Sequence, residues 1–579
     1  MNVAQALQAA LARHQAGDLD AAEKMYRDIL KKQPKQADAH NLLGVLLHQK
    51  GQFAAAIQHT QRACDLDPRF HVPHVNLGNA LQAAGRPAEA VAAFRRALAL
   101  KPAQAEILSN LASALNATGA YDEALAAAAE AMRANPNLGE AYNNEGNALL
   151  GLGRAAEALV SFERAQALGA PPFDVFFNIA EARLALGQAD LARDILARLL
   201  QANPDDARLW FGRGNAAMAL DDFTAAEQAF SRALALDPGH TGARCNLAAA
   251  HQSMGDTARA VADLEAAVAA EPEAPDLRWN LSLARLQAGD YAAAWGDHEA
   301  RWDMPAFQAL RRTWVKPNWD GGDLSGKTIL VRAEQGFGDA LRMARFLPLL
   351  AARAARVIVE CRPPLSRLFA ALPGVDEAFD LGAALPDHDL QIPVMSLPGR
   401  FGVTRDSLPA GPYLKVPADA AAPDAVARAP GLKVGLAWAG SPTRAGASRR
   451  DIPFALLAGL LDVPGVSFFS LQMGAFRDDL APGLPVTDLA EGIGDFADTA
   501  AAVAALDLVI CVDTALLHVA GGLGRPVWGL MSRPTGYYWG TDGETDPWYP
   551  TARLYRQPAP VDWAGVIARV RDDLEKLSN

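Results

Sequence analysis

A period of 34 residues in the first half of this 579-residue chain constrains its fold more than any other feature. Prolines that would end a helix mark the period, and they are Pro34, Pro68, Pro102, Pro136, Pro172, Pro204, Pro238 and Pro272. The steps are 34 residues long, apart from one of 36 and one of 32 on either side of Pro172. Units of this length stack on their neighbours to bury a continuous core, so the first half is predicted to be a stack of repeats.

The residues inside each unit indicate pairs of closely packed helices, because small residues let two helices approach and a ring fills the space that they leave. The recurring alanines are Ala22, Ala56, Ala90, Ala124, Ala158, Ala192, Ala226 and Ala260, the glycines Gly44, Gly78, Gly146 and Gly214, and the aromatic residues Tyr26, Phe94, Phe162 and Phe230. This is the pattern of tetratricopeptide repeats. We expect eight units with the repeat proline and a ninth, at about residues 275–301, that caps the stack.

Asparagines recur on the first helix of the repeats, which lines the concave face of such a solenoid. Asparagine is a mediocre helix former, so helix stability does not explain the row. Its carboxamide offers a donor and an acceptor, and a spaced row of them can hold the main chain of an extended peptide. In the alternative interpretation, these side chains bond neighbouring helices or are simply hydrated. The row consists of Asn76, Asn110, Asn144, Asn178, Asn246 and Asn280.

Composition excludes several classes of protein. Hydrophobic residues make up 50% of the chain and charged residues 21%, which is typical of folded rather than disordered proteins. The net charge of −12 argues against a general nucleic-acid binder. The four cysteines have neither metal-ligand nor CxxC spacing, which favours a reducing compartment. Because we find no run of 18 apolar residues and no signal peptide, we expect a cytoplasmic protein without a membrane span.

The second half has the pattern of an α/β region. A connector at residues 306–326 is followed by buried strands that alternate with helices, as in parallel sheets. Strands are expected at 328–332, 357–361 and 390–394, and a second set begins near residue 433, after an Ala-, Pro- and Asp-rich link at about 416–430. We therefore predict an α plus α/β chain, with a tetratricopeptide solenoid at 1–305, a first Rossmann-like lobe at 327–415 and a second at 430–579, with a cleft between the lobes.

A glycine-containing loop follows the first expected strand. Gly336 and Gly338 lie in this loop, and Asp339 opens the next helix. The third glycine of a dinucleotide fingerprint is missing and there is no Walker motif, so the two glycines alone indicate only a turn. Asp339 is a good N-cap residue, but it also stands beyond the carboxyl end of a strand, where open α/β sheets bind their ligands.

A second group of polar residues follows a strand of the last lobe. Asp513 and Thr514 stand at the carboxyl end of the strand expected at 509–512 and open a helix, whose N-terminus favours a phosphate. His518 lies one turn later on the same face, and Gly521 allows close approach of the backbone. Helix capping or a buried histidine explains each residue alone. Together at one strand end they favour a ligand site.

Three arginines follow another strand of the same lobe, and they are Arg444, Arg449 and Arg450. An arginine stays charged at neutral pH and can clamp a diphosphate or a nucleotide, although a single arginine here is also explained as a hydrated loop residue. The sequence does not choose among the three. The WYP motif at Trp548–Pro550 is interpreted as surface packing.

Several segments resemble glycosyltransferases. These are AEQGFGDALRMARFLPLL, VGLAWAGSP, FFSLQMG, DFADTAAAVAALDLVICVDTALLHVAGGLGRPVW and DPWYPTARLYRQ. The whole chain is similar to bacterial proteins that join tetratricopeptide repeats to a GT-B glycosyltransferase. Its lobes resemble the heptosyltransferase family, which has a GD motif near its start and a D-[ST]-x₃-H motif near its end. The plan also resembles the O-GlcNAc transferases, whose asparagine ladder grips the acceptor backbone, and the soluble flagellin glycosyltransferases.

The resemblance implies a metal-independent, inverting glycosyltransferase without a cofactor. Asp339 matches the GD aspartate, which acts as general base on the acceptor hydroxyl, and Asp513, Thr514 and His518 match the donor-binding motif. The donor is then a nucleotide-sugar, with a CMP-linked nonulosonic acid such as pseudaminic acid as a candidate. The acceptor is Ser or Thr of a protein such as flagellin, bound by the repeats. The loop at 534–550 departs from the heptosyltransferases, so their ADP-heptose donor does not carry over.

Two other functions stay open at this point. One is a tetratricopeptide scaffold with an inactive transferase-like lobe, and the other is a transferase that acts on lipopolysaccharide or another glycan. The presence of Asp339, Asp513 and His518 argues against a pure scaffold. The row of asparagines argues for a protein acceptor over a glycan.

Overall fold

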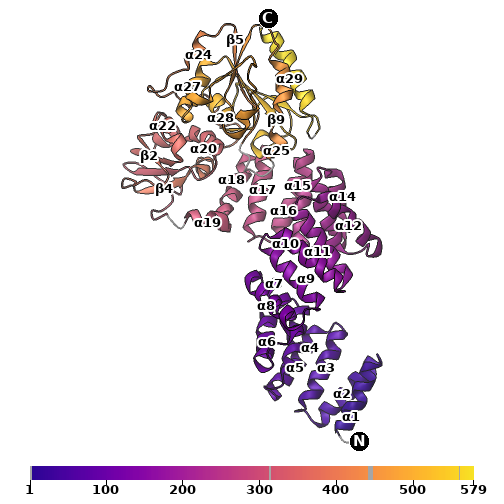
Figure 1. Ribbon diagram of the computed structural model, residues 1–579. Coiled ribbons are helices and arrows are strands. Elements are labelled where there is room, and N and C mark those ends of the chain that lie inside the picture. The colour runs from indigo at the N-terminus through magenta and orange to yellow at the C-terminus, as the bar shows by residue number, and fades with distance from the viewer. Residues whose placement is uncertain (1–2, 312–313, 441–446, 560, 579) are drawn as a thin grey trace. The chain divides into compact units, whose positions relative to one another are not determined.

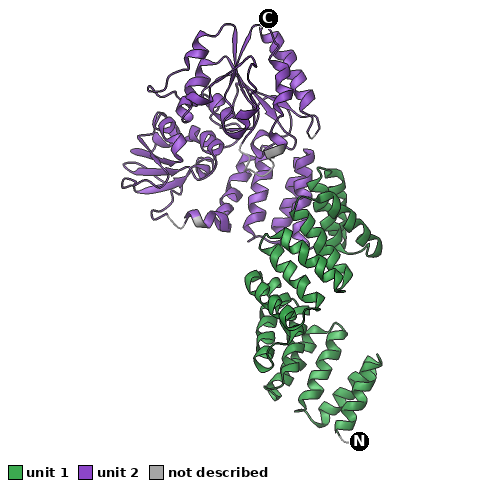
Figure 2. Cartoon of the chain, in the orientation of Figure 1, with its two compact units in different colours: residues 1–238 green, residues 239–579 purple. Residues whose placement is uncertain are grey.

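The computed structural model describes residues 3–311, 314–440, 447–559 and 561–578, and the chain divides into two compact units (Figure 2). Unit 1 comprises residues 1–238 and unit 2 comprises residues 239–579. Within the described ranges, every helix is too short or too polar to span a bilayer.

Unit 1 is a stack of paired helices that follows the 34-residue period (Figure 1). The helices are α1 (Val3–Gln15), α2 (Leu19–Lys32), α3 (Ala37–Gln49), α4 (Phe53–Leu66), α5 (His71–Ala83), α6 (Pro87–Leu100), α7 (Ala105–Ala117), α8 (Tyr121–Ala134), α9 (Gly139–Gly151), α10 (Ala155–Ala167), α11 (Pro172–Ala185), α12 (Ala189–Ala202), α13 (Ala207–Ala219) and α14 (Phe223–Leu236). The predicted all-α solenoid is confirmed.

The recurring glycines make room for the recurring rings. A Cβ atom at Gly78 would lie 2.5 Å from Phe94 Cε1, closer than such atoms pack, and Gly146 and Gly214 meet Phe162 and Phe230 in the same way. The rings of Phe94, Phe162 and Phe230 are completely buried. Each glycine therefore lets the first helix of its repeat lie directly on the ring of the second helix.

Unit 2 begins with two further helical pairs and a short extension. These elements are α15 (Thr241–Met254), α16 (Thr257–Ala270), α17 (Pro275–Ala288), α18 (Tyr291–His298), η1 (Glu299–Asp303) and α19 (Pro305–Arg311). The last pair packs into the α/β region, since Trp295 Nε1 donates to Val403 O at 2.8 Å and Trp548 Nε1 donates to Tyr291 OH at 2.9 Å. The compact units consequently divide inside the repeats, whereas the predicted limits follow the change in secondary structure.

The first sheet has four parallel strands in the order β3-β2-β1-β4. Its strands are β1 (Thr328–Arg332), β2 (Arg356–Cys361), β3 (Glu377–Asp380) and β4 (Leu390–Pro393). The helices of this region are α20 (Phe337–Met343), η2 (Ala344–Phe346), α21 (Leu347–Ala351), α22 (Pro363–Ala370), η3 (Val394–Ser396) and α23 (Leu397–Arg400). In the central register Val331 lies between Val359 and Ile392, and all three side chains are buried.

The second sheet has six parallel strands in the order β10-β9-β8-β5-β6-β7. Its strands are β5 (Leu432–Ala437), β6 (Val466–Ser470), β7 (Val486–Asp488), β8 (Leu508–Val512), β9 (Val527–Met531) and β10 (Ala552–Arg556). The helices are α24 (Asp424–Arg428), α25 (Ala447–Arg450), α26 (Phe454–Leu457), η4 (Ala458–Leu460), η5 (Gly474–Asp479), η6 (Ala490–Gly492), α27 (Phe496–Ala505), α28 (Ala515–Gly522), η7 (Tyr537–Trp539) and α29 (Trp563–Ser578). The strand order reverses between β5 and β8, and such a switch point is where doubly wound sheets bind ligands.

The predicted α plus α/β architecture is confirmed, but the sequence analysis did not anticipate three strands. These are β3, β7 and β10, and each forms an edge of its sheet. Neither β3 nor β7 contains a buried residue, so neither carries the apolar run by which a central strand is found.

Candidate functional site

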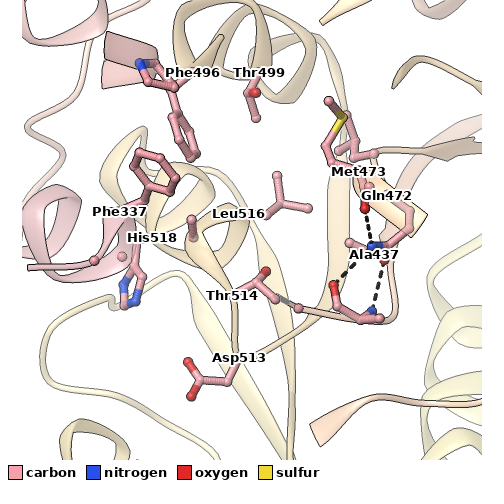
Figure 3. A pocket seen from close by; sticks show the side chains of 18 of the residues that line it. Phe337, Ala437, Gln472, Met473, Phe496, Thr499, Asp513, Thr514, Leu516 and His518 are labelled. Carbon is pink, nitrogen blue, oxygen red and sulfur yellow. Dashed lines mark hydrogen bonds between the residues drawn. The ribbon is translucent and has the colours of Figure 1, made fainter. Parts of the chain in front are cut away.

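A cavity of about 710 Å³ lies within unit 2 and is lined by residues that follow strands of both sheets (Figure 3). The loop after β1 contributes Gly336 to Asp339, the end of β5 contributes Ala437 and Gly440, and the start of α28 contributes Asp513 to Leu516. The segment 536–539 closes another side. The cavity therefore occupies the carboxyl ends of β1, β5 and β8, where the sequence analysis expected ligands.

Gly338 of α20 lies against His518 of α28, so the helices that follow β1 and β8 are in close contact there. A Cβ atom at position 338 would be 2.9 Å from His518 Cδ2, so only glycine fits without a shift of the ring. Next to this contact, Phe337 packs on Phe496 with ring centroids 5.1 Å apart, as Figure 3 shows. Gly338 thus brings Asp339, in the first turn of α20, to the same cavity wall as His518.

Asp513 anchors two groups of the cavity wall. Trp539 Nε1 donates to Asp513 Oδ1 at 2.9 Å, and Arg450 Nη1 lies 3.2 Å from the backbone oxygen of Asp513 and 3.8 Å from its Oδ2. The backbone oxygen of Asp513 accepts from the arginine that lines the cavity, and its carboxylate forms an ion pair with that arginine and orients the indole beside it. Asp513 is accordingly placed to position the wall rather than to cap α28.

Thr514 is the N-cap residue of α28, but its side chain makes no capping hydrogen bond. Its Oγ1 is buried and has no hydrogen-bond partner among the described residues. A buried hydroxyl without a partner is destabilising unless a ligand or water satisfies it. Because Thr514 lines the cavity at a helix N-terminus, this hydroxyl and the first N–H groups of α28 can together receive an anionic oxygen.

A chain of hydrogen bonds fixes the ring of His518. Tyr413 OH donates to Leu341 O at 2.8 Å, Tyr549 OH lies 3.1 Å from Tyr413 OH, and His518 Nδ1 lies 3.0 Å from Tyr549 OH. Since the carbonyl only accepts, Tyr549 must donate to Tyr413 and accept from Nδ1–H. Burial raises the pKa of Tyr549, which keeps its hydroxyl protonated. The neutral His518 ring therefore carries its proton on Nδ1.

The WYP motif was interpreted as surface packing, and this interpretation is wrong. Trp548 and Tyr549 are fully buried, and Tyr549 both bonds His518 and packs its ring against Gly521. Trp539, which the sequence analysis also missed, stacks on His518 with centroids 5.4 Å apart and planes at 16°. The signal in the sequence was a density of aromatic residues at 537–549 that exceeds that of the rest of the chain.

Two buried arginines, one in α20 and one in η2, contact the aromatic segment at residues 537–549. Arg342 lies over the rings of Tyr538 and Trp548 at 4.2 and 4.3 Å, and is 3.9 Å from Asp546. Arg345 donates to Trp548 O at 2.7 Å. Burial raises the pKa of Asp546, while Arg342 opposes that rise. These contacts join the two sheets behind the cavity and fix the position of η7.

Of the other residues predicted on the donor side, two do not line the cavity and one lies outside the residues that the structure describes. Gly521 does not line the cavity, and its contact is the ring of Tyr549. Arg449 is in α25 but does not line the cavity, whereas Arg450 does. Arg444 lies outside the described residues. No group of three His, Cys, Asp or Glu side chains that could hold a metal ion occurs within the described ranges.

Four asparagines of the row bond the preceding repeat through their amide nitrogens. In unit 1, Asn76 donates to Asn41 Oδ1 at 2.8 Å and Asn144 donates to Ser109 O at 2.9 Å. Asn110 and Asn178 make equivalent bonds to the repeat before their own, and Asn246 and Asn280 lie half-buried on α15 and α17 of unit 2. The bonds agree with the alternative interpretation of the row. In Asn76, Asn110, Asn144 and Asn178 these bonds use an N–H of the carboxamide. That the row binds a peptide stays a prediction.

Comparisons with known proteins separate the two halves of the chain. A tetratricopeptide repeat model matches residues 7–69, 75–139, 177–241 and 245–309. The model of glycosyltransferase family 9, the heptosyltransferases, matches residues 472–556, a range that contains Asp513 and His518 but not Asp339. Together the matches support a glycosyltransferase that carries tetratricopeptide repeats.

One relative and two solved structures illustrate these similarities. The chain is 27% identical over 318 residues to Protein FlbA of Caulobacter vibrioides, covering 48% of this chain and about half, 52%, of that protein. A tetratricopeptide repeat protein from Parabacteroides merdae is 18% identical with a TM-score of 0.36, covering 45% of this chain and 98% of that one. YrrB, a tetratricopeptide protein with an unusual peptide-binding site, is 25% identical with a TM-score of 0.25, covering 31% of this chain and 94% of that one. TM-scores this low do not indicate a shared function.

Proposed function

We propose that the chain is a protein O-glycosyltransferase of the GT-B type, which moves a sugar from a nucleotide-sugar to Ser or Thr of an acceptor protein bound by the repeats. The observation that carries the proposal is one cavity lined by Asp339, which follows a strand of the first sheet, and by Thr514 and Arg450, which follow strands of the second. A carboxylate on one wall and anion-binding groups on the other are what a transfer between a hydroxyl and a nucleotide phosphate requires.

The reaction is a single displacement with inversion. The acceptor oxygen attacks the anomeric carbon as Asp339 takes the hydroxyl proton, and the bond between that carbon and the phosphate oxygen breaks with its electron pair leaving on the phosphate. The N–H groups at the start of α28, Thr514 Oγ1 and Arg450 stabilise the departing charge. Asp513 holds Arg450 and Trp539 in place for this step.

The acceptor side of the proposal rests on the repeats. Four carboxamides of the row each donate a hydrogen bond to the preceding repeat, and this bond fixes the orientation of the amide. They belong to Asn76, Asn110, Asn144 and Asn178. An amide that is oriented in advance loses less conformational entropy when it bonds a peptide. We assign the row to binding the acceptor backbone, with flagellin as the candidate acceptor and a CMP-linked nonulosonic acid as the candidate donor.

Mass spectrometry of the acceptor tests the function directly. The full chain is incubated with flagellin and, in separate reactions, CMP-pseudaminic acid, CMP-legionaminic acid, ADP-heptose or UDP-GlcNAc. A mass increase on Ser or Thr with one donor is the expected result, and its size identifies the sugar. Transfer to lipopolysaccharide with no protein modified would reassign the acceptor. Absence of both transfer and nucleotide binding would leave the repeat scaffold as the function.

A further inference from the structure

A second cavity in unit 2, of about 490 Å³, lies beside the end of α15 and is rich in arginine. Its wall includes Arg533, Arg556 and Arg569, and no aspartate or glutamate is among the described residues that line it. The chain as a whole has a net charge of −12. The three arginines therefore make this cavity locally positive in a protein whose net charge is negative.

Backbone carbonyls hold the three guanidinium groups in place. Arg533 donates to Met254 O at 2.8 Å and to Pro558 O at 3.2 Å, and Arg569 donates to Arg556 O at 2.5 Å. Arg556 donates to the carbonyls of Trp539 and Gly543 at 2.6 and 2.8 Å. Carbonyl partners orient a guanidinium without neutralising it, and each of these groups has five N–H donors.

The neutral groups of the wall suit the same kind of ligand. Gln557 is only 3% exposed, and its Oε1 accepts from the backbone N–H of Arg533 at 2.9 Å. Its Nε2 is buried and has no hydrogen-bond partner among the described residues. The hydroxyls of Ser253, Ser532 and Thr541 also line the cavity, but each donates to a protein acceptor, which leaves the guanidinium groups and Gln557 as the donors of the wall. A buried amide N–H without a partner points to a missing acceptor.

Two aspartates act on the charge of Arg556, but neither of them lines the cavity. Burial lowers the pKa of Arg556, and Asp546 and Asp542 act in the opposite direction. Asp546 is itself buried beside Arg342, and neither aspartate lines the cavity. The hollow consequently presents hydrogen-bond donors and positive charge from several sides.

We propose that this second cavity is an oxyanion site, which binds a carboxylate or phosphate group between Arg533, Arg556 and Arg569. Arginine forks match the geometry of both groups, and charge-assisted bonds to them are the strong ones. Nothing in the proposed transfer reaction uses these arginines.

The position of the cavity suggests two sources for the anion. The segment 532–541 lines both cavities, with residues 532–535 and 541 on the second and residues 536–539 on the first. The other wall is the end of α15, a first helix of the repeats. An acidic side chain of the acceptor protein is one source, and this source rests on the proposed function. Free phosphate is the other.

Titration calorimetry with inorganic phosphate tests the site in the full chain. Arg569→Gln and the double variant Arg533→Gln/Arg569→Gln are compared with Arg571→Gln, a control on the same helix that pairs with Glu575 outside the cavity. The phosphate affinity should fall at least about tenfold in the test variants and stay unchanged in the control. Arg569→Gln alone suffices if the double variant melts at a low temperature, because the Arg569 side chain donates to a single exposed backbone oxygen, that of Arg556.

Tungstate diffused into crystals of the full chain locates the anion by its anomalous signal. A peak beside Arg533 and Arg569 is expected. If there is no peak there and phosphate affinity is equal in wild type and in folded Arg569→Gln, the second cavity is not an oxyanion site. Neither measurement involves sugar transfer, so a failure of the proposed function leaves this outcome unaffected.

A competition experiment distinguishes the sources. A serine-containing peptide with several aspartates and its asparagine counterpart are titrated against phosphate-loaded protein. Displacement by the aspartate peptide alone, lost in Arg569→Gln, assigns the site to an acidic segment of the acceptor. Equal behaviour of both peptides, with phosphate still bound through Arg569, assigns it to a free anion.

Discussion

Gly78 in the repeats and Gly338 at the cavity have the same steric role. Each leaves room for a ring with which a Cβ atom would clash. The ring at Gly78 is Phe94, which lies in the same repeat and recurs with the period. The ring at Gly338 is His518, which lies in α28, the helix that follows β8 of the second sheet. In the repeats the partner of a glycine can be read from the spacing of the sequence. In the cavity it depends on how two sheets are brought together.

The two regions also differ in what surrounds the close contact. Phe94 is completely buried among apolar residues of neighbouring helices, and it serves packing alone. His518 is held by Tyr549 and Trp539 beside a cavity that also contains Thr514 Oγ1 without a protein partner. A buried hydroxyl that lines a cavity and lacks a protein partner calls for an explanation, and a ligand supplies one. The comparison therefore assigns stability to one region and chemistry to the other.

Asp339→Asn gives the sharpest test of that assignment. An amide keeps the shape of the side chain but cannot take the acceptor proton, so we expect kcat to fall roughly 100- to 10,000-fold. The melting temperature should stay close to that of wild type. Asp387→Asn, at an exposed aspartate of the same region, is the control. A kcat within a few fold of wild type would remove Asp339 from the mechanism.

Gly338→Ala should affect catalysis more than stability. The new Cβ atom would lie 2.9 Å from His518 Cδ2, so the ring must shift and its contacts with Trp539 and Tyr549 are disturbed. Misplacement of this size costs about 100-fold in rate, and we expect a loss of 10- to 100-fold in kcat/KM. Steady-state kinetics and a denaturant titration measure the two effects. Unchanged kinetics would show that the position of His518 is unimportant.

Gly78→Ala is the matched change in the repeats, and we expect the opposite balance. Overpacking against Phe94 should lower the free energy of unfolding by about 1–3 kcal/mol. Transfer to a small acceptor that does not need the repeats should proceed at the wild-type rate. Phe94→Leu in the same chain should restore part of the stability by giving the methyl group room. A kinetic defect as large as that of Gly338→Ala would break the comparison.

Glu334 lies where the last repeat meets the loop that carries Asp339. Its Oε1 is 3.2 Å from Arg301 Nη2, its Oε2 accepts from Val394 N–H at 3.0 Å, and burial raises its pKa to about 7. Between the ordinary pKa of about 4.5 and 7, the folded state holds more protons than the unfolded state. The contribution of Glu334 to stability is therefore fully present below pH 4.5 and is lost as the pH rises through 7.

Glu334→Gln should flatten this part of the pH profile. Between pH 5 and 7.5 the free energy of unfolding of wild type should fall relative to that of the variant by an amount on the order of 2 kcal/mol. The contribution of His298, whose pKa burial holds well below its usual range, cancels in the difference. Denaturant titrations across the pH range measure the slopes, with Glu491→Gln at an exposed site as control. If the free energies of unfolding of wild type and Glu334→Gln changed in parallel between pH 5 and 7.5, Glu334 would not titrate in this range.

Asn144→Ala tests the smallest effect, the role of the asparagine row. Loss of its bonds to Ser109 should lower the free energy of unfolding by about 1 kcal/mol. Asn116→Ala is the control, because Asn116 also bonds a neighbouring repeat, donating to Asn144 O at 2.8 Å, but lies outside the row. If the row binds acceptor backbone, Asn144→Ala alone should raise the acceptor KM. Equal KM values in the two variants would leave the row a structural feature.

The sequence by itself determined the repeats and the strands that are buried on both faces. The period places Gly78 opposite Phe94, the strand predicted at 328–332 coincides with β1, and the one predicted at 509–512 matches β8 apart from Leu508. These features are local, because each depends on residues within one repeat or one strand. The positions of Asp339, Asp513 and Thr514 at strand ends were accessible for the same reason, since parallel strands end at one edge of a sheet.

Only the tertiary structure decided how those strand ends combine. It selected Arg450 over Arg449 as the arginine that lines the cavity, and it turned Trp548 and Tyr549 from expected surface residues into the buried support of His518. It also placed Arg533, Arg556 and Arg569 around one hollow although they come from three elements. Such contacts join segments far apart in the chain, and no periodicity records the packing that brings them together.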